Sequence, residues 1–196
     1  MILYLHGFRS SPLSFKASMM AAAMASRGQQ HAWRCPQLPA SPAAAIALAG
    51  AQARELIGAA PGGDPAALTI VGSSLGGYYA TYLAEQLGTR AVLLNPAVHA
   101  ARDLATQVGT QQDFHTGAPF EFLPAYVGEL DQLKVDHPTI PGRYLLIAAT
   151  GDEVLDWSEM RDFFAGCLQI IVPGSDHGLS DFEQWLPHVM AFAGHA

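Results

Sequence analysis

The sequence predicts an α/β fold, with about six mostly parallel strands and helices on both faces of the sheet. Two observations predict it. Short apolar runs of strand length alternate with longer alanine-rich or amphipathic stretches of helix length. A central run also leads directly into Gly72-Ser73-Ser74-Leu75-Gly76 and then into a helix-like stretch. Right-handed crossovers would place the carboxyl ends of the strands along one edge, where such sheets bind ligands.

The first half of the chain contains four of the expected strands and three of the expected helices. The strands are residues 2–5, 31–35, 68–71 and 91–94. The helices are residues 14–27, 42–59 and 78–87. Ser41-Pro42 combines an N-cap residue with a first-turn proline, and Gly28 and Gly88 suit helix ends. In the first helix, the apolar spacing places Phe15, Met19, Ala22 and Ala23 on one face.

After the fourth strand, the alternation of strands and helices is interrupted. Segments this long between strands are usually functional, so residues 97–142 are expected to form a cap or lid-like insertion. Two short helical patterns lie within it, at residues 101–108 and 125–133. The alternation resumes with elements at residues 143–149, 157–165 and 168–172. A final helix is expected from Ser180 or Asp181, with Glu183 or Gln184 placed for a capping box.

Length, charge and composition limit the classes of protein that fit. At 196 residues, the chain suits one domain with a sizeable core, expected to span residues 1–196. The net charge of −7, without a cluster of basic residues, argues against nucleic-acid binding. The apolar runs are too short for a membrane span, and the amino-terminal run is too short for a signal peptide. Cys35 and Cys167 fit two reduced thiols, so a cytoplasmic location is expected.

Ser74 lies at the apex of the strand-turn-helix, in the pattern G-x-S-x-G. On such a turn this pattern is typical of the nucleophile elbow, which tolerates only small neighbours, here Gly72 and Gly76. The pattern also arises by chance, and a glycine-rich turn without chemistry is the alternative. A phosphate-binding loop does not fit, because no Lys-Ser or Lys-Thr pair follows. Ser74 is therefore a candidate nucleophile, provided that other residues supply a base and an acid.

Polar residues that suit those two roles follow the fifth and sixth expected strands. His177 comes after the sixth strand, and a histidine can accept the serine proton at neutral pH. Asp152 directly follows Gly151 at the end of the fifth strand, and a carboxylate there would orient the histidine. Glu153 and Asp156 are alternative acids, and either could instead cap the next helix.

The loop after the first strand and the start of the elbow helix could bind a developing oxyanion. The backbone N–H of Leu75 follows the nucleophile at a helix N-terminus, whose dipole favours negative charge. Phe8 is expected to supply the second N–H, since Gly7 allows close backbone approach. His6 is expected to shape this loop through hydrogen bonds. Arg9 could contact an anionic part of a substrate or be a solvated loop arginine.

Other residues could border a substrate pocket in the same region. Tyr78 and Tyr79 begin the elbow helix. One of them could approach the pocket while the other packs in the core, and Tyr78 is the candidate for the pocket. Leu155 and Trp157 follow the fifth strand and could border an acyl site or belong to the core.

These motifs together resemble the α/β-hydrolase superfamily, and most closely the small bacterial YqiA-type esterases. The stretches that carry the resemblance keep their order along the chain: LYLHGFRSSP, IVGSSLGGYYATYLA, LLNPAV, TGDEVLD and GSDHGLSDFE. The resemblance implies an α/β-hydrolase fold, a triad of Ser74, Asp152 and His177, and no metal or cofactor. One departure is the sequence before His177, Ser175-Asp176, where a Gly-Asn-like pair is expected.

The sequence therefore predicts a serine esterase that acts on a small-molecule acyl ester or thioester. One alternative is an acyltransferase, which would use the same triad but an acceptor other than water. Another alternative is a binding module that keeps the fold without catalysis.

Overall fold

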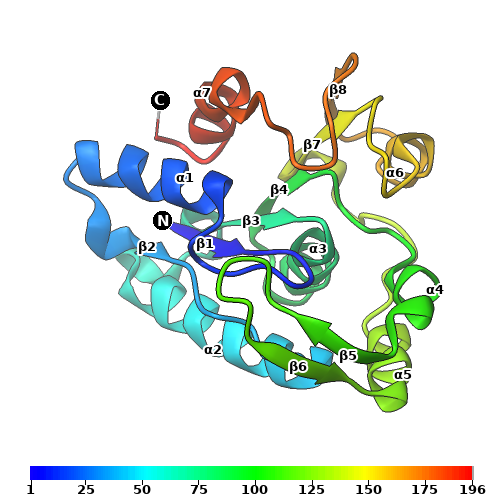
Figure 1. The fold of residues 1–196 in the computed structure, drawn as a ribbon. Helices are drawn as coiled ribbons and strands as arrows, with labels where there is room; N and C mark the ends of the chain where they lie inside the picture. The colour runs from blue at the N-terminus through cyan, green and yellow to red at the C-terminus, as the bar shows by residue number, and fades with distance from the viewer. Residues whose placement is uncertain (196) are drawn as a thin grey trace.

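The computed structural model describes residues 1–195 and is built on a six-stranded parallel sheet (Figure 1). In chain order the strands are β1 (Ile2–Leu5), β2 (Trp33–Arg34), β3 (Thr69–Ser73), β4 (Arg90–Leu94), β7 (Tyr144–Ala149) and β8 (Leu168–Val172). Across the sheet they are ordered β2-β1-β3-β4-β7-β8, and every neighbouring pair is parallel. The predicted α/β fold is thus confirmed, and β3 lies near the middle of the sheet.

Helices cover both faces of this sheet (Figure 1). One face carries α1 (Phe15–Ser26) and α7 (Phe182–Phe192); the other carries α2 (Pro42–Ala59), α3 (Leu75–Leu87) and α6 (Trp157–Phe163). Successive residues of a strand point to opposite faces, so a strand covered on both faces is apolar throughout. In β1, Ile2 and Tyr4 pack in the core under α1 and α7, whereas Leu3 and Leu5 pack in the core under α2 and α3.

The segment between β4 and β7 contains a hairpin that the sequence patterns did not predict. Its elements are α4 (Ala100–Leu104), β5 (Gly109–Gln112), β6 (Pro119–Phe122) and α5 (Pro124–Gln132), with β5 and β6 antiparallel. The two helices correspond to the two expected helical patterns. The strands were missed because β5 is polar and β6 begins with proline. They are held by tertiary contacts, since Phe8 packs edge-on against Phe120 and Phe122 at 5.8 and 5.1 Å between ring centroids.

The buried face of α1 differs from the predicted one. Lys16, Met20 and Met24 are buried, whereas Phe15 is 53% exposed. The helix consists mainly of alanine and methionine, so it is apolar on most sides and its sequence only weakly specifies which side packs. The face that contacts Tyr4 and Val71 follows the i, i+4, i+8 spacing from Lys16, which brings this lysine into the interior.

Two further element ends differ from the sequence prediction. The second strand is only two residues long, because residues 30–32 form a short turn of 3₁₀-helix before it. The final helix begins at Phe182 without the expected capping box: the Asp181 carboxylate instead accepts hydrogen bonds from Ser175 Oγ and Trp185 Nε1. The remaining single turns of 3₁₀-helix are η2 (Pro61–Gly63), η3 (Pro65–Ala67), η4 (Ala105–Gln107) and η5 (Pro141–Arg143). Within residues 1–195, each helix is too short or too polar to cross a membrane.

The turn between β3 and α3 requires the small residues that its sequence contains. A Cβ atom on Gly76 would lie 2.0 Å from the carbonyl oxygen of Leu5, and one on Gly72 would lie 2.2 Å from the carbonyl oxygen of Gly76. Both obstacles are backbone atoms of the central sheet and its turn, which cannot move independently. The expectation that both neighbours of the turn must be small is confirmed.

Replacing Gly76 with alanine should therefore destabilise the protein by about 3 kcal/mol, because the added methyl group forces α3 away from β1. The free energy of unfolding in urea measures this effect. Gly128→Ala is the matched control: Gly128 lies exposed in α5 with open space around its Cα, so alanine should stabilise that helix by about 0.8 kcal/mol. Equal stability of the two variants would show that the close approach at Gly76 is not required.

Candidate active site

Ser74 lies between β3 and α3, at the carboxyl end of a central strand. Its backbone has φ 55° and ψ −122°, a conformation that residues with a side chain rarely adopt. Three hydrogen bonds hold it: the Ser74 N–H donates to the Leu94 carbonyl at 3.0 Å, and the Ser74 carbonyl accepts from Gly77 at 2.9 Å and Ala97 at 3.0 Å. The end of β4 and the loop after it therefore keep the strained turn in place.

Ser74, His177 and Asp152 form one hydrogen-bonded chain. Ser74 Oγ lies 3.0 Å from His177 Nε2, and Asp152 Oδ2 lies 2.8 Å from His177 Nδ1. The Asp152 side chain is 0% exposed, and its Oδ1 accepts the backbone N–H groups of Val154 and Leu155 at 2.8 Å. These contacts are all satisfied when His177 donates from Nδ1, which leaves Nε2 free to accept the serine proton. The three candidate residues, distant in sequence, therefore lie together.

The two alternative acids have other partners. Glu153 Oε2 accepts the backbone N–H of His177 at 3.0 Å, so it contacts the loop rather than the ring. Asp156 caps α6 and accepts the hydroxyl and backbone N–H of Ser158 at 2.7 and 2.8 Å. These hydrogen bonds lower the pKa of Asp156 below its ordinary value. Of the three carboxylates, Asp152 is the one in contact with the imidazole.

Asn95 ties the His177 loop to the sheet, a role that sequence reasoning missed. It directly follows β4, is fully buried and has φ 43°. Its Oδ1 accepts the Ala149 N–H at 2.8 Å, and its Nδ2 donates to the carbonyls of Asp176 and His177 at 3.0 Å. Its position in LLNPAV, directly after a strand at the edge that carries Ser74, was the available signal.

Replacing Asn95 with alanine should destabilise the protein by about 3 kcal/mol, because it leaves one buried N–H and two carbonyls without partners. The expected readouts are the free energy of unfolding in urea and a lower kcat, since the His177 loop loses its anchor. The N95D variant should be no more stable and have no higher kcat than Asn95→Ala, because its carboxylate would face the carbonyl oxygens of Asp176 and His177. Recovery of both stability and kcat in N95D would contradict this role.

The loop after β1 lies against Ser74. A Cβ atom on Gly7 would be 3.2 Å from Ser74 Cβ and 3.6 Å from Ser74 Oγ. Within residues 1–195, the N–H groups of Phe8 and Leu75 have no backbone or side-chain acceptor. His6 Nδ1 donates to the Gly7 carbonyl at 3.0 Å, while His6 Nε2 accepts the Leu38 N–H at 3.0 Å. Burial lowers the pKa of His6, which favours the neutral ring that these two contacts need.

A cavity of about 640 Å³ opens beside Ser74 and His177. Most of its wall is apolar, with side chains from the loop after β1, from the segment between β4 and β7 and from the loop after β7: Phe8, Leu104, Phe114, Val154 and Leu155. Leu155, Gly7 and Arg9, three of the candidate pocket residues, also line this cavity. A cavity of this size and polarity suits a small organic molecule.

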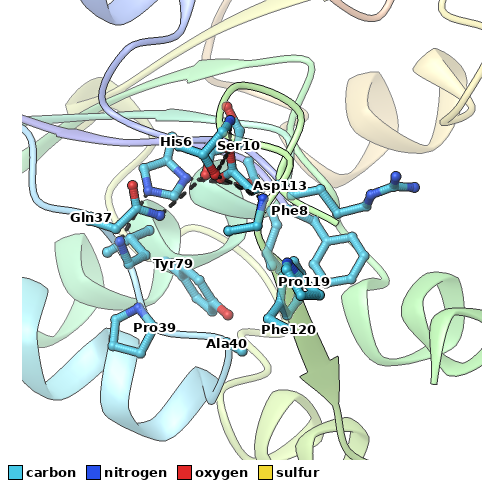
Figure 2. A pocket seen from close by; sticks show the side chains of 16 residues that line it. His6, Phe8, Ser10, Gln37, Pro39, Ala40, Tyr79, Asp113, Pro119 and Phe120 are labelled. Atoms are coloured by element: carbon cyan, nitrogen blue, oxygen red, sulfur yellow. Dashed lines mark hydrogen bonds between the residues drawn. The ribbon is translucent and has the colours of Figure 1, made fainter. Parts of the chain in front are cut away.

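A second cavity of about 380 Å³ adjoins the first. Gly7, Phe8, Arg9, Ser10 and Leu75 line both, so the loop after β1 separates them. Figure 2 shows His6, Tyr79 and Phe120 around the second cavity. It contains neither Ser74 nor His177 in its wall.

Tyr78 does not line the cavity beside Ser74, contrary to the sequence prediction. Its hydroxyl donates to the carbonyl of Leu130 in α5 at 2.9 Å, and its ring borders a small void with Phe163 and Phe164. Consecutive helical residues diverge by about 100° in direction, so only one of the two tyrosines can face the loop after β1. That residue is Tyr79.

Arg9 attaches the loop after β1 to the hairpin. Its Nε donates to the Gln112 carbonyl at 2.9 Å, its guanidinium lies 4.2 Å from the ring centroid of Phe114, and its own carbonyl accepts the Phe114 N–H at 2.8 Å. The protein thus engages the Nε–H and one face of the guanidinium. The hairpin and the loop that carries Phe8 form one contact region at the mouth of the cavity.

Lys16 is a second residue that sequence reasoning missed. It is 9% exposed, its Nζ donates to the Gly178 carbonyl, and it lines the cavity beside Ser74. The signal was a lone lysine in an apolar helix, in line with Met20 and Met24. In residues 1–195, no cluster of three His, Cys, Asp or Glu side chains is arranged to hold a metal ion.

Comparison with known proteins assigns the fold and the family. The model of the "Uncharacterised protein family (UPF0227)" matches residues 1–194. A metagenome-derived lipolytic enzyme from the LipS and LipT pair is 18% identical, with a TM-score of 0.73, over 100% of this chain and 93% of the other. Mouse alpha/beta hydrolase domain-containing protein 10 is 14% identical, with a TM-score of 0.68, over 98% and 89%. The monoacylglycerol lipase of Paleococcus ferrophilus is 13% identical, with a TM-score of 0.66, over 100% and 94%.

Proposed function

Because the chain belongs to the UPF0227 family and has the α/β-hydrolase fold, we propose that it is a serine hydrolase of carboxylic esters or acyl thioesters. One observation carries the proposal: Ser74 Oγ, the His177 ring and the buried Asp152 carboxylate lie in one hydrogen-bonded chain beside an apolar cavity. A binding module would not need a strained serine hydrogen-bonded to a histidine that a buried carboxylate orients.

In the proposed reaction, Ser74 Oγ attacks the acyl carbonyl while His177 Nε2 takes the hydroxyl proton. Asp152 holds the ring in the required tautomer and stabilises the imidazolium that forms. The N–H groups of Phe8 and Leu75 donate to the oxyanion of the tetrahedral intermediate, with the N-terminus of α3 adding its dipole. His177 then protonates the leaving alcohol or thiol, and an acyl-Ser74 ester remains.

Water completes the cycle. His177 removes a proton from a water molecule, whose oxygen attacks the acyl-Ser74 carbonyl. The second tetrahedral intermediate collapses when His177 returns the proton to Ser74 Oγ, which releases the carboxylic acid. The Ser74 proton thus passes to the leaving alcohol or thiol, and a water proton replaces it on Ser74, both by way of His177 Nε2.

The ester class of substrate has two supports. The cavity wall is mostly apolar, which suits an acyl chain. The similar structures include a lipolytic enzyme and a monoacylglycerol lipase, and both of those activities cleave esters. We also propose that residues 97–142 act as a cap on a single domain, because Leu104, Phe114 and the β5–β6 hairpin lie around the cavity and the loop after β1.

A substrate panel tests this function. It contains p-nitrophenyl esters from butyrate to dodecanoate, the matching acyl thioesters, and a p-nitroanilide as the amide control. We expect turnover of esters or thioesters with a maximum at one chain length, which the cavity volume sets, and negligible turnover of the anilide. Absence of ester and thioester turnover across the panel would overturn the proposal.

A further inference from the structure

Lys16 places a buried positive charge at the wall of the cavity beside Ser74. Its side chain is 9% exposed and its Nζ has one hydrogen bond, to the Gly178 carbonyl, which leaves two of the three ammonium hydrogens to face other partners. Among residues 1–195, no carboxylate forms an ion pair with it. Burial lowers the pKa of Lys16 to about 8, so the ammonium still predominates at neutral pH.

The carboxylates near Lys16 have other partners. Asp152 and Asp176 act on its charge from beyond ion-pair distance. Asp152 is bonded to His177, and Asp176 Oδ1 accepts the Ser180 N–H at 2.8 Å. A buried charge without a direct counter-ion is costly for folding. A contribution to folding stability therefore does not explain why the Lys16 ammonium is buried. The residue lines a cavity that a ligand can enter.

A second unsatisfied group lies beside it. Ser14 Oγ is buried, makes no hydrogen bond of ordinary geometry within residues 1–195, and lies near the Tyr4 hydroxyl; Ser14 and Tyr4 line the same cavity as Lys16 and Ser74. Both residues lie at the start of α1, whose first turn carries no acidic side chain. The helix dipole therefore adds positive potential at the same place. A buried ammonium, an unpartnered hydroxyl and a helix N-terminus thus share one part of the cavity.

We propose that Lys16 and Ser14 form a subsite for a carboxylate of the substrate, so that the preferred ester carries a carboxylate besides its scissile bond. This inference rests on the proposed hydrolase function. One ammonium balances one negative charge, which in a buried site favours a carboxylate over a doubly charged phosphate. The apolar wall accommodates the carbon chain that joins the carboxylate to the ester.

Matched substrate pairs test the subsite in the wild-type protein. The first pair is the mono-p-nitrophenyl ester of adipic acid and its methyl ester, which differ by one charge on the acyl side. The second pair, 4-carboxyphenyl butyrate and its methyl ester, carries that charge on the leaving group. We expect kcat/KM about 10- to 100-fold higher for the acid in one of the pairs, mainly through KM, with a preference that weakens as salt is added. The pair that shows it identifies which side of the ester carries the carboxylate.

Variants identify the residues. Lys16→Met should lower kcat/KM for the preferred acid about 10- to 100-fold more than for its methyl ester, and Ser14→Ala should do so to a smaller extent. Lys134→Met is the control, because Lys134 is 59% exposed and pairs with Asp136. It should leave the preference for the acid unchanged.

Three results would overturn the subsite: equal kcat/KM within both wild-type pairs, equal losses on acid and methyl ester in Lys16→Met, or an equal change of preference in Lys134→Met. Equal losses would mean that Lys16 only positions the His177 loop through Gly178. Calorimetric titration of the wild type with adipate separates this inference from the proposed function. If the wild type binds adipate and Lys16→Met does not, the subsite is supported even when no ester is turned over. If esters are turned over but the acids are not preferred and adipate does not bind, the subsite is overturned and the proposed hydrolase function stands.

Discussion

Replacing Ser74 with alanine should lower kcat for p-nitrophenyl esters by a factor on the order of 10⁶, equivalent to about 8 kcal/mol of transition-state stabilisation. The hydroxyl is the group that would form the acyl-enzyme, and no rearrangement of His177 can replace it. Steady-state kinetics on the best ester of the panel measure the loss. The residual rate should reflect only the oxyanion donors and the binding of substrate.

Ser73→Ala is the matched control for this variant. Ser73 precedes Ser74 in the chain, is 7% exposed and also lines the cavity, but the side chain that is hydrogen-bonded to His177 Nε2 is that of Ser74. It should retain kcat within about tenfold of the wild type, since it takes no part in bond formation. Both variants should keep the urea midpoint of the wild type within a small margin. A Ser74→Ala protein that keeps most of its activity would contradict the mechanism.

Replacing Asp152 with asparagine should lower kcat by about 10⁴-fold. The amide can still accept the N–H groups of Val154 and Leu155, so the loop should keep its shape. Its NH₂ group would then face His177 Nδ1 and favour the wrong tautomer, and the negative charge that stabilises the imidazolium would be lost. Pre-steady-state release of p-nitrophenol would show that acylation itself has slowed.

Two neighbouring carboxylates provide the controls for this variant. Glu153→Gln loses the charge that faces the His177 N–H and should lower kcat by only about fivefold, because Glu153 is exposed. Asp156→Asn should leave both kcat and stability close to those of the wild type, because asparagine caps a helix about as well as aspartate does. A larger loss of kcat in either control than in Asp152→Asn would contradict the proposal that Asp152 is the acid of the triad.

The sheet and the placement of Ser74, Asp152 and His177 at one edge of it could be predicted from sequence for one physical reason. Buried parallel strands are continuous apolar runs, and their carboxyl ends must meet at one edge. Ser74, Asp152 and His177 each follow such a run, so local patterns were enough to place them together. The hydrogen bonds of the structure connect the same three side chains.

Features that depend on packing between distant segments could not be predicted in this way. The β5–β6 hairpin is polar on one strand and is held by Phe8 from the other end of the chain. The side of α1 that packs is decided by contacts with Tyr4 and Val71, which bury Lys16 instead of Phe15. An alanine- and methionine-rich helix offers several apolar faces, and its sequence alone does not choose among them.

The most direct test of the nucleophile is covalent labelling with a fluorophosphonate, which reacts with an activated serine and mimics the tetrahedral intermediate. We expect one adduct per chain by intact mass spectrometry, with fragmentation of the labelled peptide placing it on Ser74 rather than on Ser73. Labelling should be lost in Ser74→Ala and strongly slowed in His177→Ala, since the histidine activates the hydroxyl. Absence of an adduct, or an adduct on another residue with Ser74 unmodified, would contradict the proposal that Ser74 is the nucleophile.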